Sequence, residues 1–181
     1  MQLLEINKNT VKTGDILLVS SYSWLSQAIQ FFQRIGHKRE GSKYNHAAVF
    51  CWLDGCLYVI EADQYGIAIT DFKKYLNTKD KLLLLHPVFI IKYDDCRNFM
   101  LNFCGHSPYD YKALPLEILR FITFGLIKPE KYKSEGTSFR CSEWAAFVMH
   151  QFNNKIFPFP GAIDPVDIYE NENFTHKVIQ E

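Results

Sequence analysis

The stretch NHAAVFCWLDGCLYVIEAD, residues 45–63, decides the fold because it predicts a β-hairpin. Two runs rich in β-branched, aromatic and other apolar residues flank the dipeptide Asp54-Gly55. Asp-Gly between two such runs is typical of a two-residue hairpin turn. That turn pairs Leu53 with Cys56 and sets the register of every pair further along the two strands.

Three polar residues of this hairpin have side chains suited to acid–base chemistry. With a two-residue turn, His46 lies opposite Asp63, and the side-chain period of two puts His46, Glu61 and Asp63 on one face. Glu61 is then a diagonal neighbour of His46. A three-residue loop would shift the register and separate His46 from both acids. The hairpin therefore offers an imidazole with a carboxylate partner, either Glu61 or Asp63.

Further strands are expected on both sides of the hairpin. A short helix is expected over residues 71–76, and from residue 93 onward the patterns are mostly helical. Because the sheet-forming segments come first and the helices later, the sequence predicts an α+β fold. One domain over residues 1–181 accounts for the whole chain. The additional strands are predicted at residues 14–20, 66–70 and 82–90.

Composition narrows the classes of function. The 181 residues are 48% hydrophobic, with 20 Lys and Arg against 20 Asp and Glu, so no basic surface for nucleic acid is expected. The longest apolar stretch, residues 82–91, is too short to span a bilayer, and the first residues do not resemble a secretory signal. Five cysteines, an odd number, indicate reduced thiols in a cytoplasmic protein, and their spacing fits no common zinc site.

A second informative segment is SFRCSEWAAFVMHQF, residues 138–152. Ser138 is expected to start a helix, which places Cys141 in the first turn. The helix dipole and the first N–H groups stabilise a negative charge there and lower the pKa of a thiol. A stripe at helical spacing is expected to face the sheet and consists of Cys141, Ala145, Val148 and Phe152.

An imidazole beside Cys141 would activate the thiol, and an acid would hold the imidazole in the required tautomer. The residues therefore predict a Cys141–His46–Glu61 triad, with Asp63 as the alternative acid. On pattern alone, Cys141 is equally consistent with a small buried residue at a helix start. His46 is equally consistent with a histidine at a strand end that bonds a carbonyl group.

The segments GDILLV, SWLSQAIQ, SKYNHAAVF, YVIEA and FRCSEW together resemble the YiiX/YebB-like branch of the NlpC/P60 superfamily, which are circularly permuted papain-like proteins. The resemblance extends over residues 14–152. It implies a permuted papain-like fold in which an antiparallel sheet packs against the helix that carries the cysteine. It also implies Cys141 as the nucleophile, His46 as the general base and acid, and Glu61 as the residue that orients His46.

Two more residues are placed near the site by the same resemblance. The segment GHSPYDY, residues 105–111, is similar to a G-x-P-Y-D stretch of this branch, which implies that Tyr109 lines the cleft. Asp15 follows Gly14 as in the Gly-Asp pair of the family. The alternatives are a packed tyrosine in a turn and an aspartate that caps a turn.

The function predicted from residues and resemblance is a thiol hydrolase that forms an acyl-enzyme with amide substrates, as a peptidase or amidase does. It requires no metal and no organic cofactor. One alternative is a lipid-directed acyl hydrolase or an acyltransferase of the LRAT-like group. The apolar helical pattern of residues 114–132 supports it and leaves a peripheral membrane contact open. The other alternative is a binding module without turnover. The expected partner is thus a peptide, amide or acyl-lipid substrate.

Overall fold

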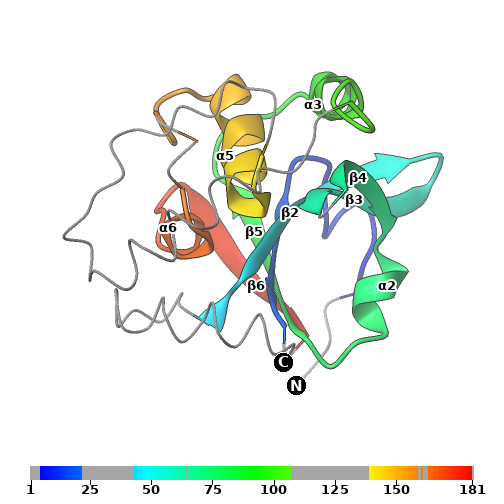
Figure 1. Ribbon diagram of the computed structural model, residues 1–181. Coiled ribbons are helices and arrows are strands. Elements are labelled where there is room, and N and C mark those ends of the chain that lie inside the picture. The colour runs from blue at the N-terminus through cyan, green and yellow to red at the C-terminus, as the bar shows by residue number, and fades with distance from the viewer. Residues whose placement is uncertain are drawn as a thin grey trace.

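An antiparallel sheet forms the centre of the molecule (Figure 1). The structure is a computed structural model that describes residues 5–21, 43–63, 65–106, 139–158, 160 and 163–180. Within these residues, six strands pair in the order β4-β3-β2-β1-β5-β6, and all neighbours are antiparallel. The strands are β1 (Ile16–Ser20), β2 (His46–Leu53), β3 (Cys56–Asp63), β4 (Gly66–Asp71), β5 (Lys81–Pro87) and β6 (Phe174–Gln180).

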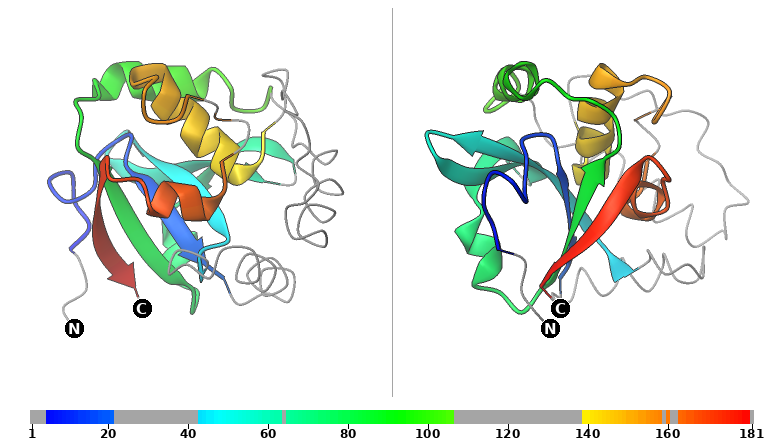
Figure 2. Two further views of the ribbon diagram at one scale, coloured as in Figure 1. Left: turned by 90° about the vertical axis from the view of Figure 1, so that its left-hand side faces the viewer. Right: turned by 180° about the vertical axis from the view of Figure 1, so that it is seen from behind.

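Helices cover both faces of this sheet, which confirms the expected α+β class. Residues of α3, α5 and α6 join one hydrophobic cluster on one face, and the segment that carries α2 joins a second cluster on the opposite face (Figures 1 and 2). The described helices are α2 (Lys73–Leu76), α3 (Tyr93–Leu101), α5 (Cys141–Phe152) and α6 (Pro165–Tyr169).

The alternation of side chains along β2 assigns its residues to the two faces. Ala47 and Val49 belong to the cluster under α5, whereas Ala48 and Phe50 belong to the cluster on the α2 side. Because the period is two, His46 shares the α2 side with Ala48 and Phe50. The chain thus directs its early histidine away from the face on which the body of α5 packs.

The turn between β2 and β3 has two residues, as the sequence predicts. Asp54 and Gly55 both have positive φ angles, 49° and 82°, which is the backbone of a type I′ turn. Leu53 pairs with Cys56, and the same register continues along the two strands. The pairing confirms the predicted register, and with it the expectation that His46 and Glu61 share a face.

One element differs from the expectation of mostly helical structure after residue 93. Residues Phe174–Gln180 form β6, an edge strand that pairs with β5. Its four residues 175–178 are all exposed, so the segment lacks the alternation of apolar and polar side chains that marks a half-buried strand. The strand forms because β5 offers it a free edge, which no local pattern in the sequence reveals.

Helix α5 begins later than predicted. Its first helical residue is Cys141 and its N-cap is Arg140, whereas Ser138 lies outside the described residues. Oε2 of Glu143 accepts the Arg140 backbone N–H at 3.0 Å, and the Arg140 guanidinium donates to Oε1 at 2.7 Å. This buried ion pair fixes the start of the helix next to the thiol.

Trp144 anchors α5 to the sheet. Its side chain is completely buried, and its indole N–H donates to the carbonyl oxygen of Ile60 in β3 at 3.0 Å. The predicted inward stripe is correct for Ala145 and Val148, but Cys141 itself is partly exposed. Trp144 therefore ties this helix to β3 of the hairpin, while Cys141 stays at the edge of the packed surface.

We expect Trp144→Phe to lower the free energy of unfolding by about 2–3 kcal/mol, because it removes a buried hydrogen bond and leaves a cavity. Urea denaturation measures this loss. Trp52→Phe is the matched control: its indole also donates to a carbonyl group, that of Val11, but the side chain is only partly buried. An equal or larger loss in the control would contradict the anchoring role of Trp144.

Candidate functional site

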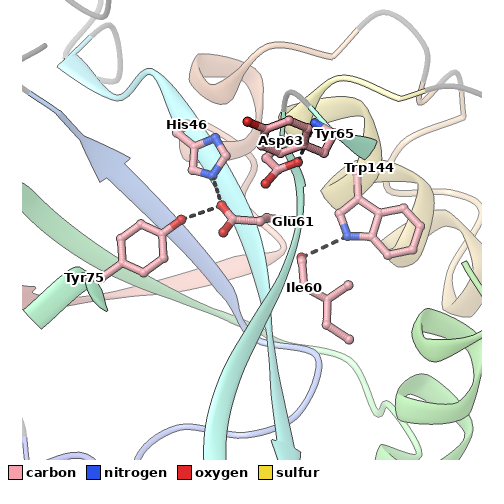
Figure 3. A network of polar contacts seen from close by, with 7 residues as sticks. All are labelled: His46, Ile60, Glu61, Asp63, Tyr65, Tyr75 and Trp144. Atoms are coloured by element: carbon pink, nitrogen blue, oxygen red, sulfur yellow. Dashed lines mark hydrogen bonds and ion pairs between the residues drawn. The ribbon is translucent and has the colours of Figure 1, made fainter. Parts of the chain in front are cut away.

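His46 and Glu61 meet on the α2 side of the hairpin (Figure 3). Nε2 of His46 lies 2.5 Å from Oε2 of Glu61, and the two side chains are 24% and 5% exposed. Both positions follow from the hairpin register, because His46 opens β2 and Glu61 lies near the end of β3. The hairpin therefore brings an imidazole and a nearly buried carboxylate into direct contact.

Asp63, the other candidate acid, has a different partner. Its Oδ1 accepts the backbone N–H of Tyr65 at 2.7 Å, which closes the turn between β3 and β4. In the described residues the carboxylate that contacts the His46 ring is that of Glu61.

Glu61 also binds groups from outside the hairpin. The hydroxyl of Tyr75 donates to Oε2 at 2.5 Å, and the Thr70 side chain of β4 lies near enough to lower the pKa of the carboxyl as well. Burial alone would raise the pKa of this carboxyl, but His46, Thr70 and Tyr75 outweigh burial and lower the pKa to about 2. Glu61 is therefore negatively charged throughout the physiological pH range.

Cys141, the first residue of α5, approaches the His46–Glu61 pair from the helix start. The His46 side chain and the backbone N–H of Ala47, both at the start of β2, are close enough to its sulfur to influence the pKa of the thiol. Burial raises the pKa of the thiol, but the charge and hydrogen bond of His46, the Ala47 N–H and the charge of Arg140 together lower it below its ordinary value. The first turn of α5 thus places a thiol with a lowered pKa beside the start of β2.

His46 responds to both of its charged neighbours. Burial lowers the pKa of His46, but the charge and hydrogen bond of Cys141, followed by those of Glu61, reverse this effect and raise the pKa to about 10. The ring therefore favours its protonated form beside Glu61 and Cys141. This arrangement can supply a nucleophilic sulfur and a proton donor at neutral pH.

Three other cysteines have a raised thiol pKa, opposite to the shift of Cys141. Burial raises the pKa of Cys51 to about 11, of Cys96 to about 12 and of Cys104 to about 11. Of the thiols with a shifted pKa, Cys141 is the one for which the shift favours the thiolate. Cys96 packs in the core, and Cys104 donates to the carbonyl oxygen of Met100, as structural cysteines do.

The structure does not bring Asp15 to this site. Asp15 precedes β1, whereas the β1 residue opposite His46 is Val19, at the other end of the strand. Asp15 and Val19 are four residues apart along the strand, at roughly 3.3 Å each, so Asp15 lies about 13 Å along the sheet from the position opposite His46. Asp15 caps a turn through the backbone N–H of Lys12 at 2.8 Å and contacts His86 at 2.7 Å. These contacts are those of an aspartate that caps a turn.

Two expectations lie outside the described residues. These are the placement of Tyr109 and the apolar helical pattern of residues 114–132. Among the helices that the structure describes, none is both long and apolar enough to cross a membrane. The described side chains of His, Cys, Asp and Glu form no group of three or more that is suited to a metal ion.

Sequence reasoning missed Tyr75 and Thr70. Thr70 could have been found from the pairing of β3 with β4, because it pairs with Val59, two residues from Glu61 on the same face. Tyr75 has no such signal, since only the tertiary path of the chain after β4 brings its hydroxyl to Glu61.

Comparison with known proteins supports the fold. No protein-family model matches the sequence, and no curated protein matches it. A solved structure is similar over most of both chains: that described as metalloprotein YiiX from Escherichia coli O157:H7, DUF1105. The match covers 92% of this chain and 96% of the YiiX chain, with a TM-score of 0.65 and 15% sequence identity. The chain therefore has a YiiX-like fold, as its sequence motifs predict.

The lowered thiol pKa has a direct consequence for alkylation. Between pH 8 and pH 6, we expect the rate of Cys141 alkylation by iodoacetamide to fall by a clearly smaller factor in the folded protein than in the unfolded one, because His46 lowers the pKa of the thiol. In the urea-unfolded protein, where the pKa is about 8.5, the rate should fall by about 100-fold. Mass spectrometry of the Cys141 peptide measures both rates. Equal pH dependence in the folded and unfolded protein would refute the thiolate.

Proposed function

We propose that this protein is a thiol hydrolase of amide bonds, a peptidase or amidase, built on a permuted papain-like domain of the NlpC/P60 type. Cys141 is the nucleophile, His46 is the general acid and base, and Glu61 orients His46. The proposal is supported by the contact of the His46 ring with the Glu61 carboxylate and by the opposite pKa shifts that His46 and Cys141 induce in each other. Residues with a purely structural role seldom place a nucleophile, a base and an orienting acid side by side in this order.

The roles of the two ring nitrogens follow from the contact with Glu61. Nε2 of His46 is held by Oε2 of Glu61, so Nδ1 is the nitrogen that serves the Cys141 sulfur. In the resting state both nitrogens carry protons, and the thiolate accepts a hydrogen bond from Nδ1. Glu61 thus keeps the ring oriented while the Nδ1 proton is transferred.

The first half of the reaction forms the acyl-enzyme. The Cys141 thiolate attacks the amide carbonyl carbon, and the carbonyl π electrons move to oxygen. The first N–H groups of an α-helix have no acceptor within the helix, so those at the start of α5 are positioned to stabilise the oxyanion. When the carbonyl re-forms, the C–N bond breaks and the Nδ1 proton of His46 passes to the leaving amine.

The second half releases the acid. Neutral His46 takes a proton from water through Nδ1, and the resulting hydroxide attacks the thioester carbonyl carbon. Collapse of the second tetrahedral intermediate breaks the C–S bond, which restores the thiolate and the imidazolium. The net reaction consumes one amide and one water and yields one carboxylic acid and one amine, so no redox partner is needed.

The YiiX structure is described as that of a metalloprotein, so the fit of a metal to this site matters. Nε2 of His46 and Oε2 of Glu61 bond each other directly at 2.5 Å, which leaves no space for an ion between them. The described residues also offer no group of three suitable ligands. The donors present do not fit a metal here, and no step of the proposed reaction involves one.

The lipid-directed function, the binding module and a cytoplasmic location have less support than the thiol hydrolase. The lipid-directed reading depends on residues 114–132, outside the part of the chain that is described. A binding module has no need of a thiolate and a protonated imidazole in contact. All five cysteines are free, which agrees with a reducing compartment such as the cytoplasm.

Cys141→Ala should abolish turnover and acyl-enzyme formation, because it removes the nucleophile and leaves the buried residues of α5 in place. We propose to assay wild type and variant side by side on peptide amides, simple esters and phospholipids. Cys141-dependent hydrolysis of amides supports the proposal. Turnover confined to acyl lipids would replace it by the lipid-directed function, and no Cys141-dependent turnover would favour the binding module.

Glu61→Gln and Asp63→Asn form a matched pair of acid-to-amide changes on one strand. We expect Glu61→Gln to lower kcat on the order of 100-fold, because His46 loses its anionic partner and its acid–base function. Asp63→Asn should stay within about twofold of wild type, because an amide oxygen can still accept the Tyr65 N–H. The reverse ranking in steady-state kinetics would show that Asp63 is the functional acid.

A further inference from the structure

A third polar side chain binds the Glu61 carboxylate, and it comes from outside the hairpin. The hydroxyl of Tyr75, on the short helix α2, donates to Oε2 at 2.5 Å, the same oxygen that contacts Nε2 of His46 (Figure 3). A rotation of the carboxylate would therefore break both contacts together. The two bonds to one oxygen restrict Glu61 to the orientation in which it faces His46.

The ring of Tyr75 is held by aromatic packing that leads back to β2. It stacks on Phe72 at a centroid distance of 6.3 Å, and Phe72 meets Phe50 edge-on at 5.0 Å. Phe50 and Phe72 are buried in the cluster on the α2 side of the sheet. Because Phe50 lies on the same strand as His46, the packing fixes the Tyr75 hydroxyl relative to the ring that Glu61 must orient.

The hydroxyl acts as a hydrogen-bond donor throughout. Burial, the charge and hydrogen bond of Glu61, and the charge of Cys141 raise the pKa of Tyr75 far above its ordinary value. The phenol therefore stays protonated and does not compete with Glu61 for the His46 proton. Tyr75 can stabilise the carboxylate without entering the proton transfer.

We propose that Tyr75 is a positioning residue of the proposed hydrolase, which holds Glu61 in the orientation that keeps His46 aligned with Cys141. This role rests on the proposed function. The effect of Tyr75 on the orientation of Glu61 can nevertheless be measured without turnover. Without the hydroxyl, Glu61 loses the bond that joins its Oε2 to α2 and gains freedom to turn away from His46. The imidazolium then loses part of its stabilisation, and the thiolate of Cys141 loses part of its counter-charge.

The test is Tyr75→Phe, which keeps the ring and removes the hydroxyl. We expect kcat to fall about tenfold, equivalent to about 1.4 kcal/mol, with KM within about twofold of wild type. The pH at which Cys141 alkylation is half-maximal should rise by about one unit. Tyr65→Phe is the matched control, because Tyr65 is 84% exposed and its backbone N–H rather than its ring binds Asp63. It should leave both quantities unchanged.

The alkylation measurement separates positioning from a structural role and from the function itself. The charged groups that bear on Tyr75 and Cys141 are Glu61, His46, Arg140 and Asp80, and the variant changes none of them. A loss of stability in urea with kcat and the alkylation midpoint unchanged would overturn the proposal, as would a downward shift of the midpoint. If Cys141→Ala retained full activity, the proposed function would fail, while the alkylation shift would still decide the role of Tyr75.

Discussion

The contact between the His46 ring and the Glu61 carboxylate, beside the thiol of Cys141, is the interaction on which the rest of this site depends. Cys141 and Glu61 are both at least partly buried, and burial alone would raise the pKa of each group. The positive charge of His46 opposes the effect of burial and lowers the pKa of both groups. The pKa values of the three groups are therefore linked, and loss of one group shifts the pKa of the others.

The sheet makes this contact possible through register. A two-residue turn puts His46 and Glu61 on one face, and a slip of one residue would place them on opposite faces. The body of α5 packs on the other face, so only its first residue comes close to the ring. Cys141 is at the helix start, where the first N–H groups and the dipole favour a negative charge.

The helix start is held by contacts separate from the site chemistry. The Arg140–Glu143 ion pair fixes the residue before Cys141, and the Trp144 indole ties the next turn to β3. Glu143 is buried, and its two carboxylate oxygens bind the backbone and the guanidinium of Arg140. The position of the sulfur is thus determined by a buried salt bridge and one aromatic hydrogen bond. The YiiX-like fold supplies the frame in which these contacts occur.

The sequence by itself determined the α+β class, the hairpin and its register. These are properties of local pattern: Asp-Gly turn geometry and the period of two act within a few residues. It also determined that Cys141 lies in the first turn of a helix. The choice of Glu61 over Asp63 could not come from the residues, because both acids share the face of His46, and it rested on resemblance.

Only the tertiary structure decided which groups outside the hairpin reach the site. The placement of Tyr75 at Glu61, the separation of Asp15 from His46 and the pairing of β6 with β5 all depend on the path of the chain between distant segments. No periodicity or turn signal encodes such a path. It follows from the way buried surfaces fit together, and a linear sequence does not display that fit.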